Sequence, residues 1–158
     1  NLLEQLVVTG AYDAEATEWF LKLKGMCTKD EWDLLRETIF TCVSDDRLRW
    51  RYYAAEGLYD RLMDEVEAKG LWALHEFEHD LAAHYPERVL ALYENDLMGK
   101  DGKSPRVGSS RNVYANFADS VNHLRSIEGG DEVANRIIDT VLSIYPRRPA
   151  LHEELGRA

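Results

Sequence analysis

The amino-acid sequence predicts an all-α fold, an irregular helical-repeat array of about seven or eight helices. Apolar residues recur at steps of three and four through most of the 158 residues, which is the spacing of one face of a helix. No stretch alternates apolar and polar residues between hairpin turns, so a β-sheet has no support. A Tyr-Pro pair also occurs twice, at Tyr85-Pro86 and at Tyr145-Pro146. We therefore expect stacked helices in a single domain over residues 1–158.

Three helices are expected before Gly70. Residues 12–24 carry one apolar face and end at Gly25. Thr28 and Glu31 have capping-box spacing, in which each side chain accepts a hydrogen bond from the other residue's backbone N–H, so a second helix is expected over 29–43. Helical spacing then continues from Ala55 to Val66. It predicts one long third helix after the loop at residues 44–46, reaching position 69.

Five more helices are expected after Gly70. Pro86 fits the first turn of a helix, because its missing N–H would be unpaired there anyway. Residues 99–110 are rich in glycine, serine and lysine, and we expect a flexible loop. Asp131 is a candidate cap for the helix that follows Gly130. The expected helices span residues 71–84, 86–97, 110 up to the pair Gly129-Gly130, 131–144 and 147–155.

The two Tyr-Pro pairs lie 60 residues apart and mark an internal repeat. At that offset Leu81 aligns with Val141, and both positions are apolar. Helix pairs that cannot bury an apolar face alone stack on their neighbours, as in α-solenoids. Tetratricopeptide repeats (TPRs) are loosely similar, since a proline also follows their second helix, although their Trp-x-x-Leu-Gly pattern is absent. We predict a TPR-like array, with a closed helical bundle as the alternative.

Composition excludes several classes of protein. The formal charge is −10, from 29 acidic and 19 basic residues, and an acidic surface repels nucleic-acid phosphates. The sequence contains no run of 18 apolar residues, so it predicts no membrane-spanning helix. Cys27 and Cys42 have no C-x-x-C spacing, so we expect reduced thiols, a cytoplasmic location and no cofactor. The chain begins at Asn1 within an apolar run, so we expect a fragment of a larger protein.

The segment His75-Glu76-Phe77-Glu78-His79 matches the zinc-protease pattern H-E-x-x-H. In such enzymes the two histidines bind zinc from one helix face, and the glutamate activates a water molecule. Here acidic residues flank His79, and no further motif marks a third ligand. We predict no catalytic or metal site, and keep a zinc-dependent hydrolase that uses His75, Glu76 and His79 as the alternative function.

Two other groups of residues are candidate binding surfaces. Trp50 and Tyr53 are flanked by arginines, and arginine and aromatic residues are enriched in protein interfaces. Because neighbouring positions of a helix point in different directions, we do not expect all the aromatic rings of this segment to be buried. The predicted partner-binding patch is Arg49, Trp50, Arg51 and Tyr53. A cationic cluster is a candidate anion site or a solvated loop, and it comprises Lys100, Lys103, Arg106 and Arg111.

Several segments resemble the C-terminal helical region of bacterial SWIM zinc-finger proteins. The resemblance covers roughly residues 50–158. It rests on residues 59–62 (Tyr-Asp-Arg-Leu), 70–72 (Gly-Leu-Trp), 84–93 (beginning His-Tyr-Pro-Glu-Arg), 110–114 (Ser-Arg-Asn-Val-Tyr) and 145–155 (beginning Tyr-Pro-Arg-Arg-Pro). The family's zinc finger, C-x-C followed by C-x-H, is absent from this chain, so the resemblance implies no metal ligands here. It implies a TPR-like appendage that serves protein contacts, and we expect a protein-interaction or scaffolding module with a protein partner.

Overall fold

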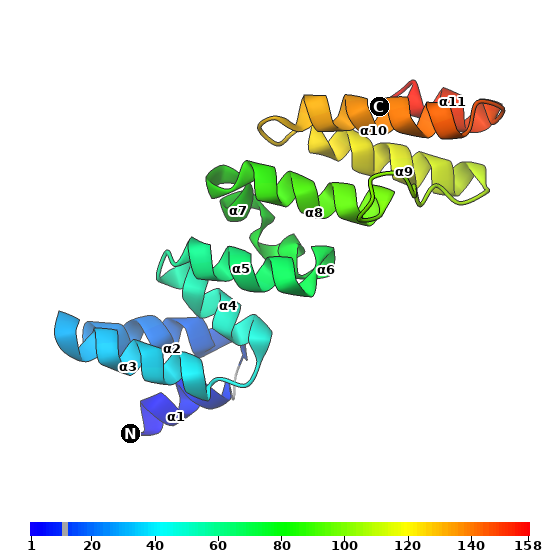
Figure 1. Cartoon of the computed structure of the whole chain (residues 1–158). Helices are drawn as coiled ribbons and strands as arrows, with labels where there is room; N and C mark the ends of the chain where they lie inside the picture. The colour runs from blue at the N-terminus through cyan, green and yellow to red at the C-terminus, as the bar shows by residue number, and fades with distance from the viewer. Residues whose placement is uncertain (11–12) are drawn as a thin grey trace. The chain divides into compact units, whose positions relative to one another are not determined.

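The computed structural model describes residues 1–10 and 13–158, and all regular structure in these ranges is helical (Figure 1). The chain divides into two compact units, unit 1 over Asn1–Leu62 and unit 2 over Met63–Ala158. The boundary falls within one helix, α5 (Tyr59–Lys69). The described helices include none with the length and apolar character needed to cross a membrane. The all-α prediction is confirmed, and the single domain stays a prediction.

The described residues form ten helical runs, so the predicted number of seven or eight is wrong. A 3-10 turn, η1 (His75–Phe77), joins α6 and α7 into one of these runs. The α-helical segments are α1 (Leu2–Thr9), α2 (Asp13–Gly25), α3 (Lys29–Cys42), α4 (Asp46–Ala55), α5 (Tyr59–Lys69), α6 (Leu71–Leu74), α7 (Glu78–His84), α8 (Pro86–Met98), α9 (Arg111–Leu124), α10 (Gly130–Ile144) and α11 (Pro149–Leu155).

Helix α1 is one of the two additions to the predicted set. The Asn1 side chain accepts a 3.0 Å hydrogen bond from the N–H of Leu3, which caps the first turn. Gly10 ends the helix in the left-handed conformation, with φ 59°. The next predicted helix, 12–24, corresponds to α2, and its first position lies outside the described residues.

The second addition arises because the long helix predicted up to position 69 is two helices, α4 and α5. Gly57 has a left-handed φ of +69°, which interrupts the helical path. The N–H of Leu58 donates a 2.9 Å hydrogen bond to the carbonyl of Tyr53, closing the turn. The apolar spacing on both sides predicted a helix but not this interruption, because a short turn leaves the spacing almost unchanged.

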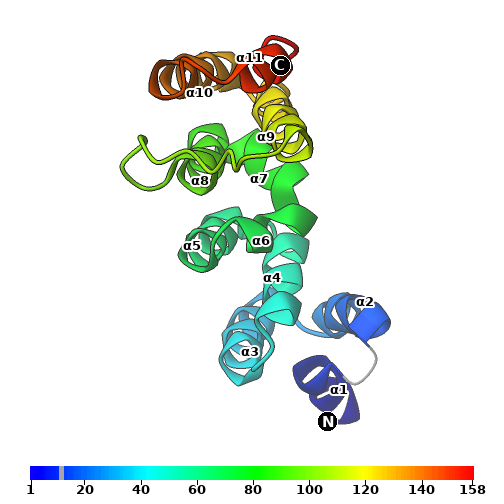
Figure 2. The same cartoon turned by 90° about the vertical axis from the view of Figure 1, so that its right-hand side faces the viewer.

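Unit 1 is built around packed aromatic rings from three helices. Phe20 of α2 stacks on Tyr52 of α4 at 4.2 Å between ring centroids, and meets the edge of Trp32 of α3 at 4.9 Å. Figure 2 shows α1 to α4 gathered together, with α1 beside α2.

The predicted capping box at the start of α3 is confirmed, since the side chains of Thr28 and Glu31 each accept a hydrogen bond from the other residue's backbone N–H.

A buried carboxylate fastens the turn after α4. The Glu56 side chain is 3% exposed, and Lys24 lies 2.9 Å from its Oε1. Arg36 and the Trp32 indole donate hydrogen bonds of 3.0 and 3.2 Å to its Oε2. Burial alone would raise the pKa of Glu56, but these three hydrogen bonds outweigh it and lower the pKa below its usual range. Glu56 therefore remains charged and links α2, α3 and α4.

Unit 2 is organised around α8, which contacts α6, α7, α9 and α10 (Figure 1). Helix α11 packs along α9. At the start of α10 the predicted cap is wrong, because Gly129 with φ 79° stands at the N-cap and no side chain caps the helix. Arg88 ties α8 to α5 through a 2.8 Å ion pair with Asp64 and a second pair with Glu67. The core of unit 2 includes Met63, Leu74, Leu81, Val89, Tyr114, Phe117, Val121, Leu124, Ile137, Val141 and Leu151.

The two Tyr-Pro joints share their local conformation. Tyr85 has φ −135° and ψ 57°, and Tyr145 has φ −119° and ψ 64°. An arginine lies over each ring, Arg88 at 5.5 Å and Arg148 at 4.0 Å from the centroid. The joints differ afterwards, because α8 starts directly at its proline whereas α11 starts three residues after Pro146. The repeat is therefore local, and a TPR-like array stays a prediction.

The segment 99–110 is irregular, as predicted, and it is attached to unit 2 at several points. The N–H groups of Ser104 and Arg106 each donate a 2.8 Å hydrogen bond to carbonyls in the last turn of α8. Val107 is 1% exposed, and Arg148 donates to the carbonyl of Gly108 at 3.0 Å. These bonds satisfy helix-terminal acceptors that would otherwise need water. The flexibility of this segment stays a prediction.

Candidate functional site

The predicted partner-binding patch lies on α4 and comprises Arg49, Trp50, Arg51 and Tyr53. Trp50 is 1% exposed and Tyr53 is 7% exposed. The Tyr53 ring meets the edge of Phe40 at 4.8 Å, and the neighbouring Tyr52 stacks on Phe20. The expectation that these aromatic rings cannot all be buried is wrong, because α4 packs on α2 and α3 at once. The rings therefore belong to the core of unit 1, and the arginines are half-buried beside it.

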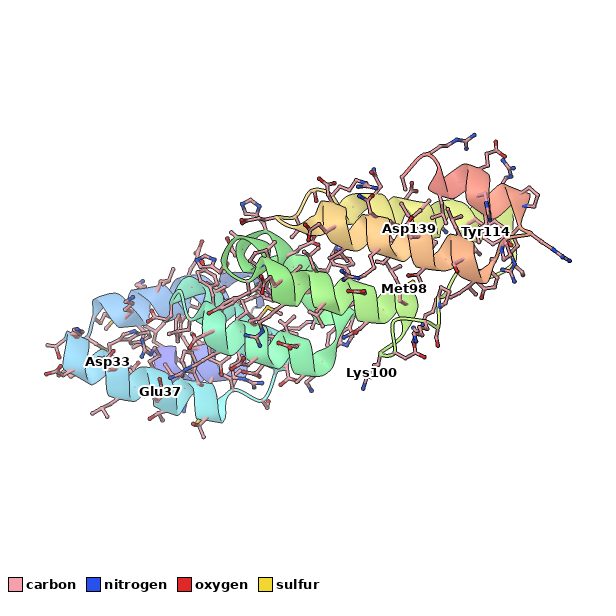
Figure 3. All side chains as sticks on the ribbon, turned by 45° about the horizontal axis from the view of Figure 1, so that its top comes forward. Asp33, Glu37, Met98, Lys100, Tyr114 and Asp139 are labelled. Atoms are coloured by element: carbon pink, nitrogen blue, oxygen red, sulfur yellow. The ribbon has the colours of Figure 1, made fainter. Side chains whose placement is uncertain are left out.

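The four predicted anion-binding residues do not act as one group. Lys100 lies just beyond Met98 at the end of α8 (Figure 3), and Arg106 lies 3.9 Å from a carboxylate of α8. Arg111, at the first position of α9, is 2.7 Å from Glu153 and 3.5 Å from Glu154 of α11. Lys103 lines a small hollow together with Asp101. A cation at a helix N-terminus is unfavourable by itself, so the two carboxylates of α11 compensate Arg111.

The H-E-x-x-H segment does not lie on one continuous α-helix. His75 begins the 3-10 turn, whereas His79 lies in α7. Both are exposed, and only His79 lines the hollow described below. Within residues 1–10 and 13–158, no three His, Cys, Asp or Glu side chains gather in a way that would hold a metal ion.

A polar group that the sequence did not predict joins α7, α8 and α9. His123 Nε2 lies 2.8 Å from Glu78 Oε1, and the Tyr93 hydroxyl donates to the same oxygen. The rings of Tyr93 and His123 meet edge to face at 5.5 Å. Burial, and then the hydrogen bond to Glu78, raise the pKa of Tyr93, so its hydroxyl stays protonated and acts as the donor. Nothing in the sequence relates His123 to Glu78, which lies 45 residues earlier.

This polar group lies at the edge of an open hollow, which we call the α7/α9 pocket. Its volume is ≈ 510 Å³, within the range of natural ligand sites. Acidic and imidazole side chains share its lining with alanine and isoleucine. The lining comprises Glu78, His79, Ala82 and Ala83 of α7, His123 of α9, and Ser126, Ile127 and Glu128 from the turn before α10.

A second hollow of ≈ 450 Å³ lies between α8 and α10, and we call it the α8/α10 groove. Leu90, Ala91 and Val133 supply apolar lining, and Glu94 and Arg136 form a 2.8 Å ion pair across it. The remaining lining residues are Pro86, Glu87, Glu128, Gly129 and Glu132. Because Glu128 lines both hollows, the groove and the pocket meet at this residue. A third hollow of ≈ 280 Å³ shares Glu94 and Arg136 with the groove and continues it toward the loop at 99–110.

Comparison of the chain with protein-family models, curated proteins and solved structures finds no match. The candidate site therefore rests on its geometry. Unit 2 presents open hollows that share lining residues and combine apolar with charged side chains, a mixture that natural ligand sites also have.

Proposed function

We propose that this chain is a protein-interaction module, and that it binds a segment of a partner protein in the α8/α10 groove. One observation carries the proposal. The groove is an open hollow between two helices, and apolar and charged side chains line it together. Grooves of this kind bind peptide segments by burying apolar anchors, while the rim selects their polar neighbours.

The resemblance to the helical region of SWIM zinc-finger proteins supports the same function. It implies that the chain is a TPR-like appendage of a larger bacterial, cytoplasmic protein, with the zinc finger encoded upstream. The residues encoded before Asn1 test this part of the proposal. Four zinc-ligand positions in the order C-x-C and C-x-H would support it, and their absence from the complete protein would overturn it.

A peptide library tests the binding function directly. We would select dodecamer peptides displayed on phage against the purified chain, and then measure the affinity of the enriched peptides by fluorescence anisotropy. Ala91 is exposed in the groove, so Ala91→Trp fills the channel without touching the core. We expect this variant to weaken binding about tenfold or more.

Ala68→Trp is the matched control. Ala68 is exposed on α5 and lines none of the three hollows of unit 2 described above. We expect the Ala68→Trp variant to bind the peptide with an affinity within about twofold of that of the unmodified chain. Failure to select any peptide, or equal losses in the two variants, would overturn the proposed groove.

A further inference from the structure

The linings of the α7/α9 pocket and the α8/α10 groove carry an excess of negative charge. We call the two together the acidic channel. Arg136 supplies its one guanidinium, and this group is already paired with Glu94. The carboxylates of the acidic channel are those of Glu78, Glu87, Glu94, Glu128 and Glu132.

Most of these carboxylates have capacity for a ligand. Glu87, Glu128 and Glu132 are exposed, and the described part of the chain offers them no hydrogen bond or ion pair. Glu78 uses a single oxygen, Oε1, for both His123 and Tyr93. Its other oxygen, Oε2, accepts no hydrogen bond from the described residues. The acidic channel therefore contains carboxylate oxygens that accept no hydrogen bond from the described residues and can accept one from a ligand.

We propose that the partner segment bound by the acidic channel is basic, with lysine or arginine side chains between apolar ones. This inference rests on the proposed function and specifies the partner's chemistry. One cationic side chain enters the α7/α9 pocket between Glu78 and Glu128. Apolar side chains of the same segment pack on Leu90, Ala91 and Val133.

Charge complementarity selects this occupant over others. Four of the five carboxylates have no guanidinium partner in the acidic channel, and this excess of negative charge repels the phosphates of a nucleic acid and the side chains of an acidic segment. A cationic side chain instead gains a carboxylate partner at each step along the rim, and complementary charge also raises the rate of association. The apolar lining residues add burial that a small inorganic cation cannot use.

The selected peptides test this inference. We expect those that Ala91→Trp blocks to be enriched in lysine and arginine relative to the unselected library. For a synthetic peptide of the enriched sequence, Glu128→Gln and Glu132→Gln should each weaken binding about three- to tenfold, and added salt should reduce the difference. Both residues are exposed, so these variants should fold normally.

Asp139→Asn is the matched control. Asp139 is exposed on α10, the same helix as Glu132 (Figure 3), and lines neither part of the acidic channel. Removal of the Asp139 charge should leave the affinity for the peptide within about twofold of that of the unmodified chain. Two outcomes would overturn the basic partner and leave the peptide-binding function in place. In the first, the peptides that Ala91→Trp blocks are not enriched in lysine or arginine. In the second, Glu128→Gln and Asp139→Asn change the affinity equally. If no peptide is blocked by Ala91→Trp, both proposals fail.

Discussion

The hydroxyl of Tyr52 donates a 2.7 Å hydrogen bond to the backbone carbonyl of Val7, 45 residues earlier. Both residues are fully buried. The carbonyl belongs to the last turn of α1, whose carbonyls have no later partner within the helix. A side chain of α4 therefore satisfies the end of α1, while its ring stacks on Phe20 of α2.

Tyr52→Phe should lower the free energy of unfolding of unit 1 by about 1–2 kcal/mol, because it leaves a buried carbonyl without this donor. Urea denaturation followed by far-UV circular dichroism would measure the change. Tyr114→Phe is the control, since the Tyr114 ring is buried but its hydroxyl makes no hydrogen bond among the described residues. It should cost less than about 0.5 kcal/mol. Equal losses in the two variants would contradict the role of the Tyr52 hydroxyl.

Glu56→Gln should make stability less dependent on pH. The pKa of Glu56 is lowered in the folded chain, so its charge contributes stability that is fully present above its unfolded pKa of about 4.3. This contribution is lost as the pH falls from that value through the lowered folded pKa. At pH 7 we expect Glu56→Gln to cost about 2–3 kcal/mol, because Lys24 and Arg36 lose their charged partner.

The measurement is a urea titration of both proteins between pH 3 and 7. The difference between them should be constant above about pH 5 and should shrink below about pH 4. Glu15→Gln, an exposed position on α2, is the control and should follow the unmodified chain throughout. A stability difference that grows as the pH falls would contradict the lowered pKa of Glu56 in the folded chain.

Gly130→Ala should destabilise unit 2 severely. A Cβ atom at this position would lie 1.6 Å from the carbonyl oxygen of Leu124, which is backbone and cannot rotate away. We expect a loss of about 3 kcal/mol, measured as a lower midpoint of thermal unfolding. Gly25→Ala at the end of α2 meets nothing within 4 Å and should be neutral or stabilising by up to about 1 kcal/mol. Similar midpoints for the two variants would contradict the close packing of the turn before α10.

The sequence predicted the helices that carry a local signal. Thr28 and Glu31 cap α3 as expected, and Pro86 begins α8. The break at Gly57 was not predicted, because the apolar spacing continues on both sides of this glycine, and a single glycine within such a pattern is compatible with either a helix or a turn. The interruption at His75 was missed for the same reason, since a 3-10 turn preserves the helical pattern of the residues around it.

The candidate site depended on information that is not local. Not all of the aromatic rings of α4 were expected to be buried, because helix periodicity describes one face, whereas Tyr52 and Tyr53 pack on different neighbouring helices. Glu78, His123 and Tyr93 come together only through the packing of α7, α8 and α9. In the sequence Glu78 counted only as an acidic residue next to His79. Its hydrogen bonds to α8 and α9 could be recognised only from the tertiary structure.

The pairing of Arg111 with α11 has a consequence for how the protein is made. A ribosome adds Glu153 42 residues after Arg111, so the first turn of α9 is synthesised well before its carboxylate partners exist. Until α11 has been made, the positive charge at the first turn of α9 lacks these two partners, and the face of α9 that contacts α11 has no neighbour from that helix. The packing of α9 in unit 2 is therefore completed only after α11 has been translated.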